Sequence, residues 1–265
     1  MVDWIYNHPT WLWGSLLVGG AALLACVGLA VFHRFVHVET RRAHNDLAGF
    51  SIAIISVVYA VLLAFIAVAT WQSFAEAESI ADTEAAAIGN LFRDTRGFPP
   101  ALGDPMRDAL RQYLSVVIRQ EWPVQQQGIV PNAGWAPLLR LHEELVEFEP
   151  QTRGQEVMQA EFLRGLNALY SARTTRLVAV QGHIPVVIWW ILAIGGALTT
   201  GFTYLFGFQD FRMHLTMTGA VAASLALVVV LIVALDWPFR GDVSISPQAY
   251  QAVERSLAGG PVASP

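Results

Sequence analysis

The dominant feature of this 265-residue sequence is a set of four long apolar runs that contain no charged side chain. The runs cover Leu12–Phe32, Leu47–Phe74, Ile184–Phe206 and Leu215–Leu235. A helix rises about 1.5 Å per residue and the hydrocarbon of a bilayer is about 30 Å thick, so about 20 apolar residues span it. A soluble bundle exposing four such runs would aggregate. The sequence therefore predicts four transmembrane helices.

The flanks of these runs support the assignment. Tryptophan and tyrosine mark the ends of the spans, as expected of an interfacial aromatic belt. The first run follows Asp3 and no arginine or lysine, so we interpret it as a retained helix and not as a cleaved signal peptide. Pro185 suits the first turn of the third span, and Asp236 with Pro238 stops the fourth.

Composition excludes several functions. Only 14% of the residues are charged, against about a quarter in soluble domains, and the net charge of −5 argues against nucleic-acid binding. All 16 basic residues are arginine, so chemistry that requires lysine is absent. The single cysteine, Cys26, permits neither an intrachain disulfide nor a cysteine-based metal site. We expect no cofactor.

The segment between the second and third spans, residues 76–183, is predicted to be an extramembrane helical domain. Its first helix continues the second span through Arg96, a second follows Asp104 and Pro105 and ends at Pro123, and a third covers Gly134–Phe148. A long fourth helix opens at Gln151 or Thr152 and leads to the third span. The expected divisions are 1–75, 76–183, 184–240 and a partly disordered tail, 241–265, with one weak helix near Pro247–Leu257. The fold class is an all-α integral membrane protein.

Charges of opposite sign are expected to meet in that domain, because its first and last helices leave the membrane side by side. Arg173 and Arg176 would then face an acidic set: Glu76, Glu78, Asp82 and Glu84. Such a cluster is either a ladder of ion pairs that fixes the register of the two helices or a charged pore mouth. Exposed pairs stabilise by only about 0.2–1 kcal/mol each, which favours the register role.

The second span carries a continuous stripe of small residues at helical spacing. Its members are Gly49, Ala53, Ser56, Ala60, Ala64 and Ala67. One interpretation is close packing of helices. The other is the wall of a pore, which would require a cyclic homo-oligomer because one chain of four helices cannot enclose a channel.

Catalytic and metal-binding patterns are weak. His142 opens a His-Glu-Glu sequence, but Val146 stands where a zinc-protease helix needs its second histidine. His33 and His37 have the i, i+4 spacing of metal ligands, but we interpret them as interfacial residues at the level of the lipid headgroups. With no nucleophile, base or metal set in view, we predict that the chain is not an enzyme and holds no metal.

Arginine distribution bears on orientation. The two short loops hold Arg34, Arg41, Arg42 and Arg212, which by the positive-inside rule places them in the cytoplasm. Residues 76–183 would then lie outside the cytoplasm, and the multi-pass chain would reside in the bacterial inner membrane.

Several short motifs together resemble the bacterial bestrophin-like family, long described as a domain of unknown function. They are Asn45–Phe50, Tyr59–Phe65, Trp71–Phe74, Ala77-Glu78, Glu84-Ala85, Glu121-Trp122, Arg173–Leu177 and, most specific, the Leu-Asp-x-Pro-Phe-x-Gly block at residues 235–241. The resemblance covers about residues 12–257.

The resemblance implies a function that the residues alone do not give. Bestrophins are pentameric, calcium-regulated anion channels whose second helix lines the pore, so it implies a homo-oligomer, inorganic ions as partners besides the lipid bilayer, and the small-residue stripe as pore wall. The sequence has no acidic calcium-clasp run, so calcium gating is not implied. Bestrophins keep their soluble part in the cytoplasm, whereas the distribution of arginines places residues 76–183 outside it. The alternative function is a non-conducting scaffold or sensor whose helical hairpin binds a partner protein.

The closing block itself has two interpretations. In the first, Asp236 has a structural role: it caps the turn over Trp237–Gly241 or pairs with an interfacial arginine such as Arg240. In the second, it lines a pore mouth. Pro238, Phe239 and Gly241 complete the family motif.

Overall fold

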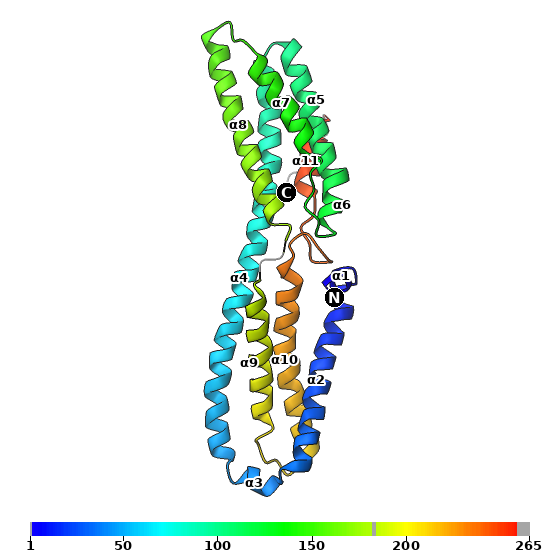
Figure 1. Cartoon of the computed structure of the whole chain (residues 1–265), viewed down its shortest axis with the longest axis vertical. Coiled ribbons are helices and arrows are strands. Elements are labelled where there is room, and N and C mark those ends of the chain that lie inside the picture. The colour runs from blue at the N-terminus through cyan, green and yellow to red at the C-terminus, as the bar shows by residue number, and fades with distance from the viewer. Residues whose placement is uncertain (1, 182–183, 259–265) are drawn as a thin grey trace. The chain divides into compact units, whose positions relative to one another are not determined.

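The computed structural model describes residues 2–181 and 184–258, and every regular element among them is a helix (Figure 1). The described residues form two compact units. The membrane unit comprises residues 2–73, 184–236 and 241–243, and the extramembrane unit comprises residues 74–181, 237–240 and 244–258. The tail that we expected over residues 241–265 is thus divided between the two units.

The membrane unit contains the four apolar spans. These lie in α2 (Thr10–Phe35), the first part of α4 (Asn45–Asp94), α9 (Val186–Thr203) and α10 (Phe211–Asp236), and all four helices are long and apolar enough to cross a membrane. Two short helices, α1 (Val2–Tyr6) and α3 (Val38–Arg42), complete it. The predicted fold class, an all-α membrane protein with four transmembrane helices, is confirmed.

Small residues let the spans approach one another. On α9, Gly195 lies directly against the ring of Tyr59 from α4, whose hydroxyl donates a hydrogen bond of 2.6 Å to the carbonyl of Leu192. On α2, Gly28 leaves the space that the ring of Tyr204 fills. Because neighbouring helices in lipid gain little from the hydrophobic effect, such close contacts carry much of their association.

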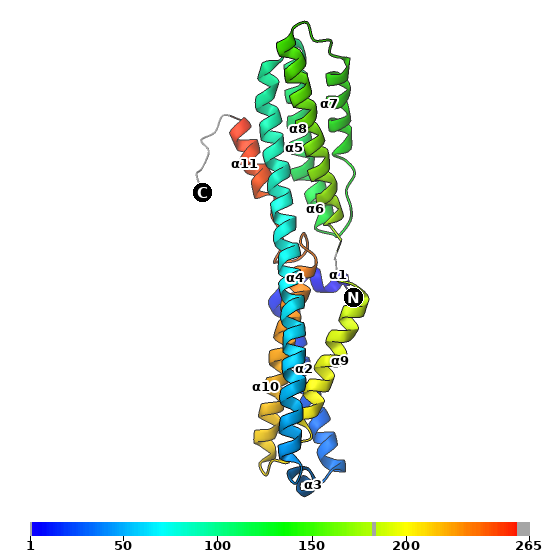
Figure 2. The same cartoon turned by 90° about the vertical axis from the view of Figure 1, so that its left-hand side faces the viewer.

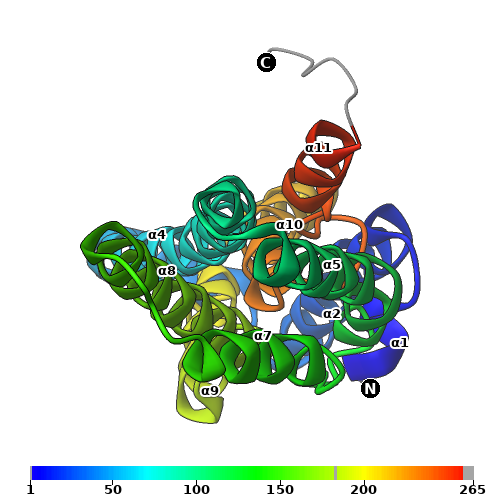
Figure 3. The same cartoon turned by 90° about the horizontal axis from the view of Figure 1, so that it is seen from above.

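The extramembrane unit comprises the second half of α4 and five further helices. They are α5 (Pro100–Val116), α6 (Trp122–Gln125), α7 (Trp135–Glu147), α8 (Arg153–Val178) and α11 (Gln248–Leu257), seen from the side in Figure 2 and end-on in Figure 3. Fully buried side chains such as Ile88, Leu110, Leu141 and Leu166 form one continuous core between α4, α5, α7 and α8. Along each of these helices the buried positions recur at helical spacing, which explains why the segment folds as a bundle.

Two predicted helix boundaries are wrong, both at prolines. The second extramembrane helix begins at Pro100 and not after Asp104, because Pro100 fits the first helical turn and burial of Met106 and Leu110 stabilises the helix through Pro105. Pro123 does not end it either. The chain passes through a wider π-helical turn at Val117–Glu121, which leads into α6 with Pro123 in its first turn.

Other expected elements are confirmed. Thr152 caps α8, accepting a hydrogen bond of 3.2 Å from the backbone N–H of Gln155. The weak tail helix is present as α11, with Tyr250 fully buried against the core. The disordered end that we predicted concerns residues 259–265, which lie outside the described residues.

The contact between α9 and α4 gives a test of this packing. In Gly195→Ala the new methyl group would overlap the ring of Tyr59, whereas in Gly201→Ala, on the same helix, it meets nothing within 4 Å. Overpacking costs about 1–3 kcal/mol, so we expect Gly195→Ala to lower the melting temperature in detergent and Gly201→Ala to leave it unchanged or slightly higher. Equal melting temperatures for the two variants would contradict the contact.

Candidate functional site

The membrane part of α4 presents the small-residue stripe beside its packed face. Tyr59 and Leu63 are buried against α9 and α10. The stripe lies roughly a quarter of a turn away, at 100° per residue. Ala53, Ala60 and Ala64 are exposed, and Gly49, Ser56 and Ala67 are partly buried. Half of the stripe is therefore exposed, and the other half is only partly covered by the other helices of its own chain.

A second, bulkier face of α4 is also open. Its exposed members are Leu47, Phe50, Ile54, Val57, Val58, Val61, Phe65, Val68 and Trp71. An open face of this length and apolarity is compatible with lipid or with a second copy of the chain.

The extramembrane unit holds a cluster of charged side chains that have no exposure to solvent. Arg173 on α8 makes a two-pronged ion pair with Glu121, with N–O distances of 2.7 and 2.6 Å. The backbone N–H of Gly134 also donates to Glu121, at 2.7 Å. The Arg173 guanidinium stacks 4.8 Å from the ring centre of Trp135. These contacts fix the arginine from both sides.

The second arginine completes the cluster. Arg176 donates to Glu84 on α4 at 2.6 and 3.1 Å, to Glu121 at 3.1 Å, and to the side chain of Gln125. Tyr113 donates its hydroxyl hydrogen to Glu84 at 2.5 Å. Two guanidinium groups thus face two carboxylates, and the cluster ties together α4, α5 with its continuation, and α8.

The cluster shifts the protonation of its members. Burial alone raises the pKa of Glu121, but the hydrogen bond and charge of Arg173, followed by the charge of Arg176, outweigh it and lower the pKa below its usual value. Burial and then the charge of Glu84 raise the pKa of Tyr113 and of Tyr250. The carboxylate of Glu121 is therefore ionised and both phenols are neutral at physiological pH, which keeps the cluster balanced.

The structure brings together some of the charges singled out in the sequence. Glu84 pairs with Arg176, whereas Glu76, Glu78 and Asp82 are exposed. The reason is helical phase: Ala77, Ala81, Glu84 and Ile88 define the buried face of α4, and the three exposed acids lie off it.

The two arginines of this cluster were expected from the sequence, whereas Glu121, Tyr113 and Gln125 were not. The signal was present as periodicity. Leu110, Leu114 and Val117 occupy the buried face of α5 and its continuation, and Glu121 and Gln125 fall at the next steps of four residues. A charged residue on an otherwise apolar face requires a buried partner, and Arg173 and Arg176 supply it.

The closing motif forms a compact turn. Asp236 accepts a hydrogen bond of 3.1 Å from the backbone N–H of Ile184, just before α9. Phe239 is fully buried, edge-on to Trp122 at 5.5 Å, and the carbonyl of Pro238 accepts from the N–H of Ile245 at 2.8 Å. Gly241 has a φ of +81°, which side-chain-bearing residues rarely adopt.

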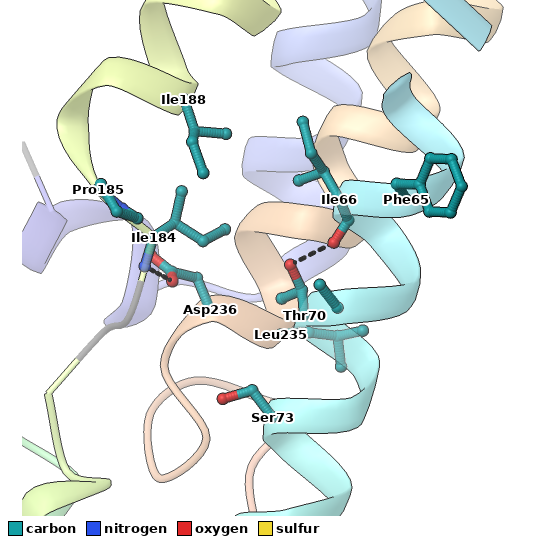
Figure 4. A pocket seen from close by; sticks show the side chains of 10 residues that line it. Phe65, Ile66, Thr70, Ser73, Ile184, Pro185, Ile188, Leu235 and Asp236 are labelled. Carbon is teal, nitrogen blue, oxygen red and sulfur yellow. Dashed lines mark hydrogen bonds between the residues drawn. The ribbon is translucent and has the colours of Figure 1, made fainter. Parts of the chain in front are cut away.

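Asp236 also lines a pocket of about 280 Å³ at the ends of the spans (Figure 4). Its other walls are mainly apolar, with Phe65 and Ile66 from α4 and Ile188 from α9, and Thr70 and Ser73 add two hydroxyl groups. Figure 4 shows Thr70 turned back to the carbonyl of Ile66, at 2.8 Å. Among the described residues of the lining, the carboxylate is the one charged group, which suits a structural cap and a polar lining group equally.

The histidines singled out in the sequence lie in different environments and share no common site. His33 faces Arg41, with 2.6 Å between its Nδ1 and the arginine Nη2, and His37 is exposed. His142 lies on α7, edge-on to Tyr170. Among the described residues no three histidine, cysteine, aspartate or glutamate side chains gather as a metal site.

Comparisons with known proteins agree with this architecture. The Bestrophin-like domain model matches residues 9–250. A bacterial Bestrophin homolog from Klebsiella pneumoniae has a similar structure, with a TM-score of 0.65 and 16% identity over 94% of this chain and 97% of that one. A point variant of that homolog gives a TM-score of 0.68 and 15% identity over 91% and 99% of the two chains. No match was found among curated proteins.

A match over nearly the whole chain defines the class: this is a four-span helical membrane protein with an extramembrane bundle. The chain belongs to the bestrophin-like family.

The buried cluster yields a stability prediction. In Glu121→Gln the paired Arg173 keeps its charge without a carboxylate, and breaking a buried ion pair costs about 3–5 kcal/mol. We expect a clearly lower melting temperature for the purified protein in detergent, followed by tryptophan fluorescence. Glu76→Gln, at an exposed position of α4, is the matched control and should melt like the wild type.

The same glutamate predicts a pH dependence. Its pKa is lower in the folded than in the unfolded chain, so its stabilising effect is complete above the unfolded value of about 4.3 and is lost as the pH falls through the folded value. The difference in melting temperature between wild type and Glu121→Gln should be constant from pH 7 to about pH 5 and should shrink below about pH 4. A difference that grows on acidification would contradict this assignment.

Proposed function

We propose that the chain is the subunit of a homo-oligomeric ion channel in which the membrane part of α4 lines the pore. Membership of the bestrophin-like family supports an ion channel in general. The observation that carries the assignment of the pore helix is the small-residue stripe, none of which is fully buried within its own chain.

A homo-oligomer is part of this proposal. Four helices packed on one another leave no axial passage wide enough for hydrated ions, so the wall has to be shared between copies. The helix with the open, continuous stripe is the natural candidate for the common axis. By resemblance to bestrophins, the number of copies would be five.

The chemistry of the stripe suits a hydrophobic constriction. Alanine and glycine leave space beside the helix axis, and the single hydroxyl of Ser56 is its only polar side chain. A narrow apolar passage conducts when wetted and closes by losing its water. Selectivity for anions is proposed by resemblance alone.

Packing of the same stripe against a neighbouring subunit is the competing interpretation. In that arrangement a larger side chain would disturb assembly, whereas in the pore it would narrow the passage and leave the oligomer intact. Conductance and oligomeric state therefore have to be measured on the same variants.

We expect the purified protein in liposomes to conduct, with a reversal potential in a KCl gradient that lies toward the chloride value. Ala60→Leu and Ser56→Leu should reduce the unitary conductance by roughly twofold or more, because the constriction narrows. Ala30→Leu, the same enlargement at an exposed position of α2, should conduct like the wild type. Silent liposomes that hold intact oligomer would contradict the channel and favour a scaffold or sensor.

A further inference from the structure

A buried arginine without a carboxylate partner lies at the loop end of the membrane unit. Arg41, on α3, is only 4% exposed. Its Nη1 donates to the carbonyls of Tyr204 and Phe206 at 3.1 and 3.4 Å, and its Nη2 lies 2.6 Å from Nδ1 of His33. All three acceptors are neutral. Two are backbone carbonyls, and the third is Nδ1 of His33, which carries no proton in this contact because a guanidinium can only donate.

The charge of this arginine is not balanced within the described residues. No carboxylate among them lies within ion-pair distance of Arg41, and its buried Nε–H has no acceptor. Glu39 and Asp46, close in sequence, are exposed, and Asp210 caps α10 through the N–H groups of Arg212 and Met213. Burial accordingly lowers the pKa of Arg41 from its usual value. An unpaired buried charge is costly, whereas an anion beside it would offset that cost.

A pocket of about 330 Å³ adjoins this arginine within the same unit. Its polar lining comes from Thr40, Arg41, His44 and Ser51, and its apolar lining includes Leu47, Phe202 and Leu205. The pocket is thus amphipathic. It lies where the loop between the first two spans meets the end of α9, which is the depth of lipid headgroups for helices of this length.

We propose that this pocket binds an anionic phospholipid, with the phosphate group beside Arg41 and His44 and the start of an acyl chain along Leu47, Phe202 and Leu205. A phosphate oxygen matches the charge and donor geometry of a guanidinium. The apolar wall distinguishes a lipid from a free inorganic anion, which would gain nothing from it. The proposal does not depend on conduction, and it concerns the opposite end of the spans from the Asp236 pocket.

Lipid retention by the full-length protein tests this assignment. Delipidated protein in a nonionic detergent is incubated with dioleoyl phosphatidylglycerol or dioleoyl phosphatidylcholine, and bound lipid is counted by native mass spectrometry. We expect the wild type to retain phosphatidylglycerol roughly fivefold or more over phosphatidylcholine. Equal retention of the two lipids would overturn the proposal.

Two pairs of variants locate the preference. Arg41→Gln and His44→Glu should abolish it. Arg42→Gln and His37→Glu, which change the same charges at exposed positions of the same loop outside the pocket lining, should keep it. Should Arg41→Gln fail to fold, the exposed His44→Glu decides, and a folded His44→Glu protein with the wild-type preference would overturn the assignment.

A competition experiment separates the two sources of phosphate. Millimolar inorganic phosphate is added to the wild-type complex with phosphatidylglycerol. A lipid site keeps its lipid, because the acyl contacts are not replaced. Displacement of the lipid would show a free-anion site and overturn the assignment to a phospholipid.

Discussion

The bilayer imposes one condition on which the rest of this structure depends: no backbone N–H or C=O group can face hydrocarbon without a partner. Continuous helices meet that condition within each segment, and α2, α4, α9 and α10 meet it over all four apolar runs. Polar side chains in the spans also need hydrogen-bond partners, and they find them in backbone carbonyls. Thr70 returns its hydroxyl to the carbonyl of Ile66 on its own helix, and Tyr59 reaches the carbonyl of Leu192 on α9.

Charge is managed differently in the two units. In the extramembrane unit two arginines and two glutamates are removed from water together, so that each carries a partner and the cluster is neutral as a whole. Buried pairs of this kind specify which helices meet more than they add stability, because desolvation consumes much of the attraction. In the membrane unit Arg41 is buried against neutral acceptors only. Because no described carboxylate pairs with Arg41, we infer that its counter-ion comes from outside the chain.

Much of the fold could be predicted because the relevant signals are local. The four spans follow from uncharged length, and the cap at Thr152 follows from its side chain and the helix behind it. Prolines were misleading at Pro105 and Pro123, because packing of Met106, Leu110 and Trp122 into the core overrides a local breaker. The candidate sites were less predictable. Among the acids near Arg173 and Arg176, only the phase of α4 separates buried Glu84 from exposed Glu76.

The amino-acid sequence alone determined that this chain is a membrane protein, that it has four helical spans, and that it carries the motifs of the bestrophin-like family. Each of these properties depends only on the order of side chains along the chain. The tertiary structure decided which side chains meet: Glu121 with both arginines, Asp236 with the start of α9, and Arg41 with two carbonyls of a distant loop. These contacts join residues 52 to 165 positions apart in the chain. Their geometry arises only when helices pack, since no periodicity within one segment specifies the face that another segment will present.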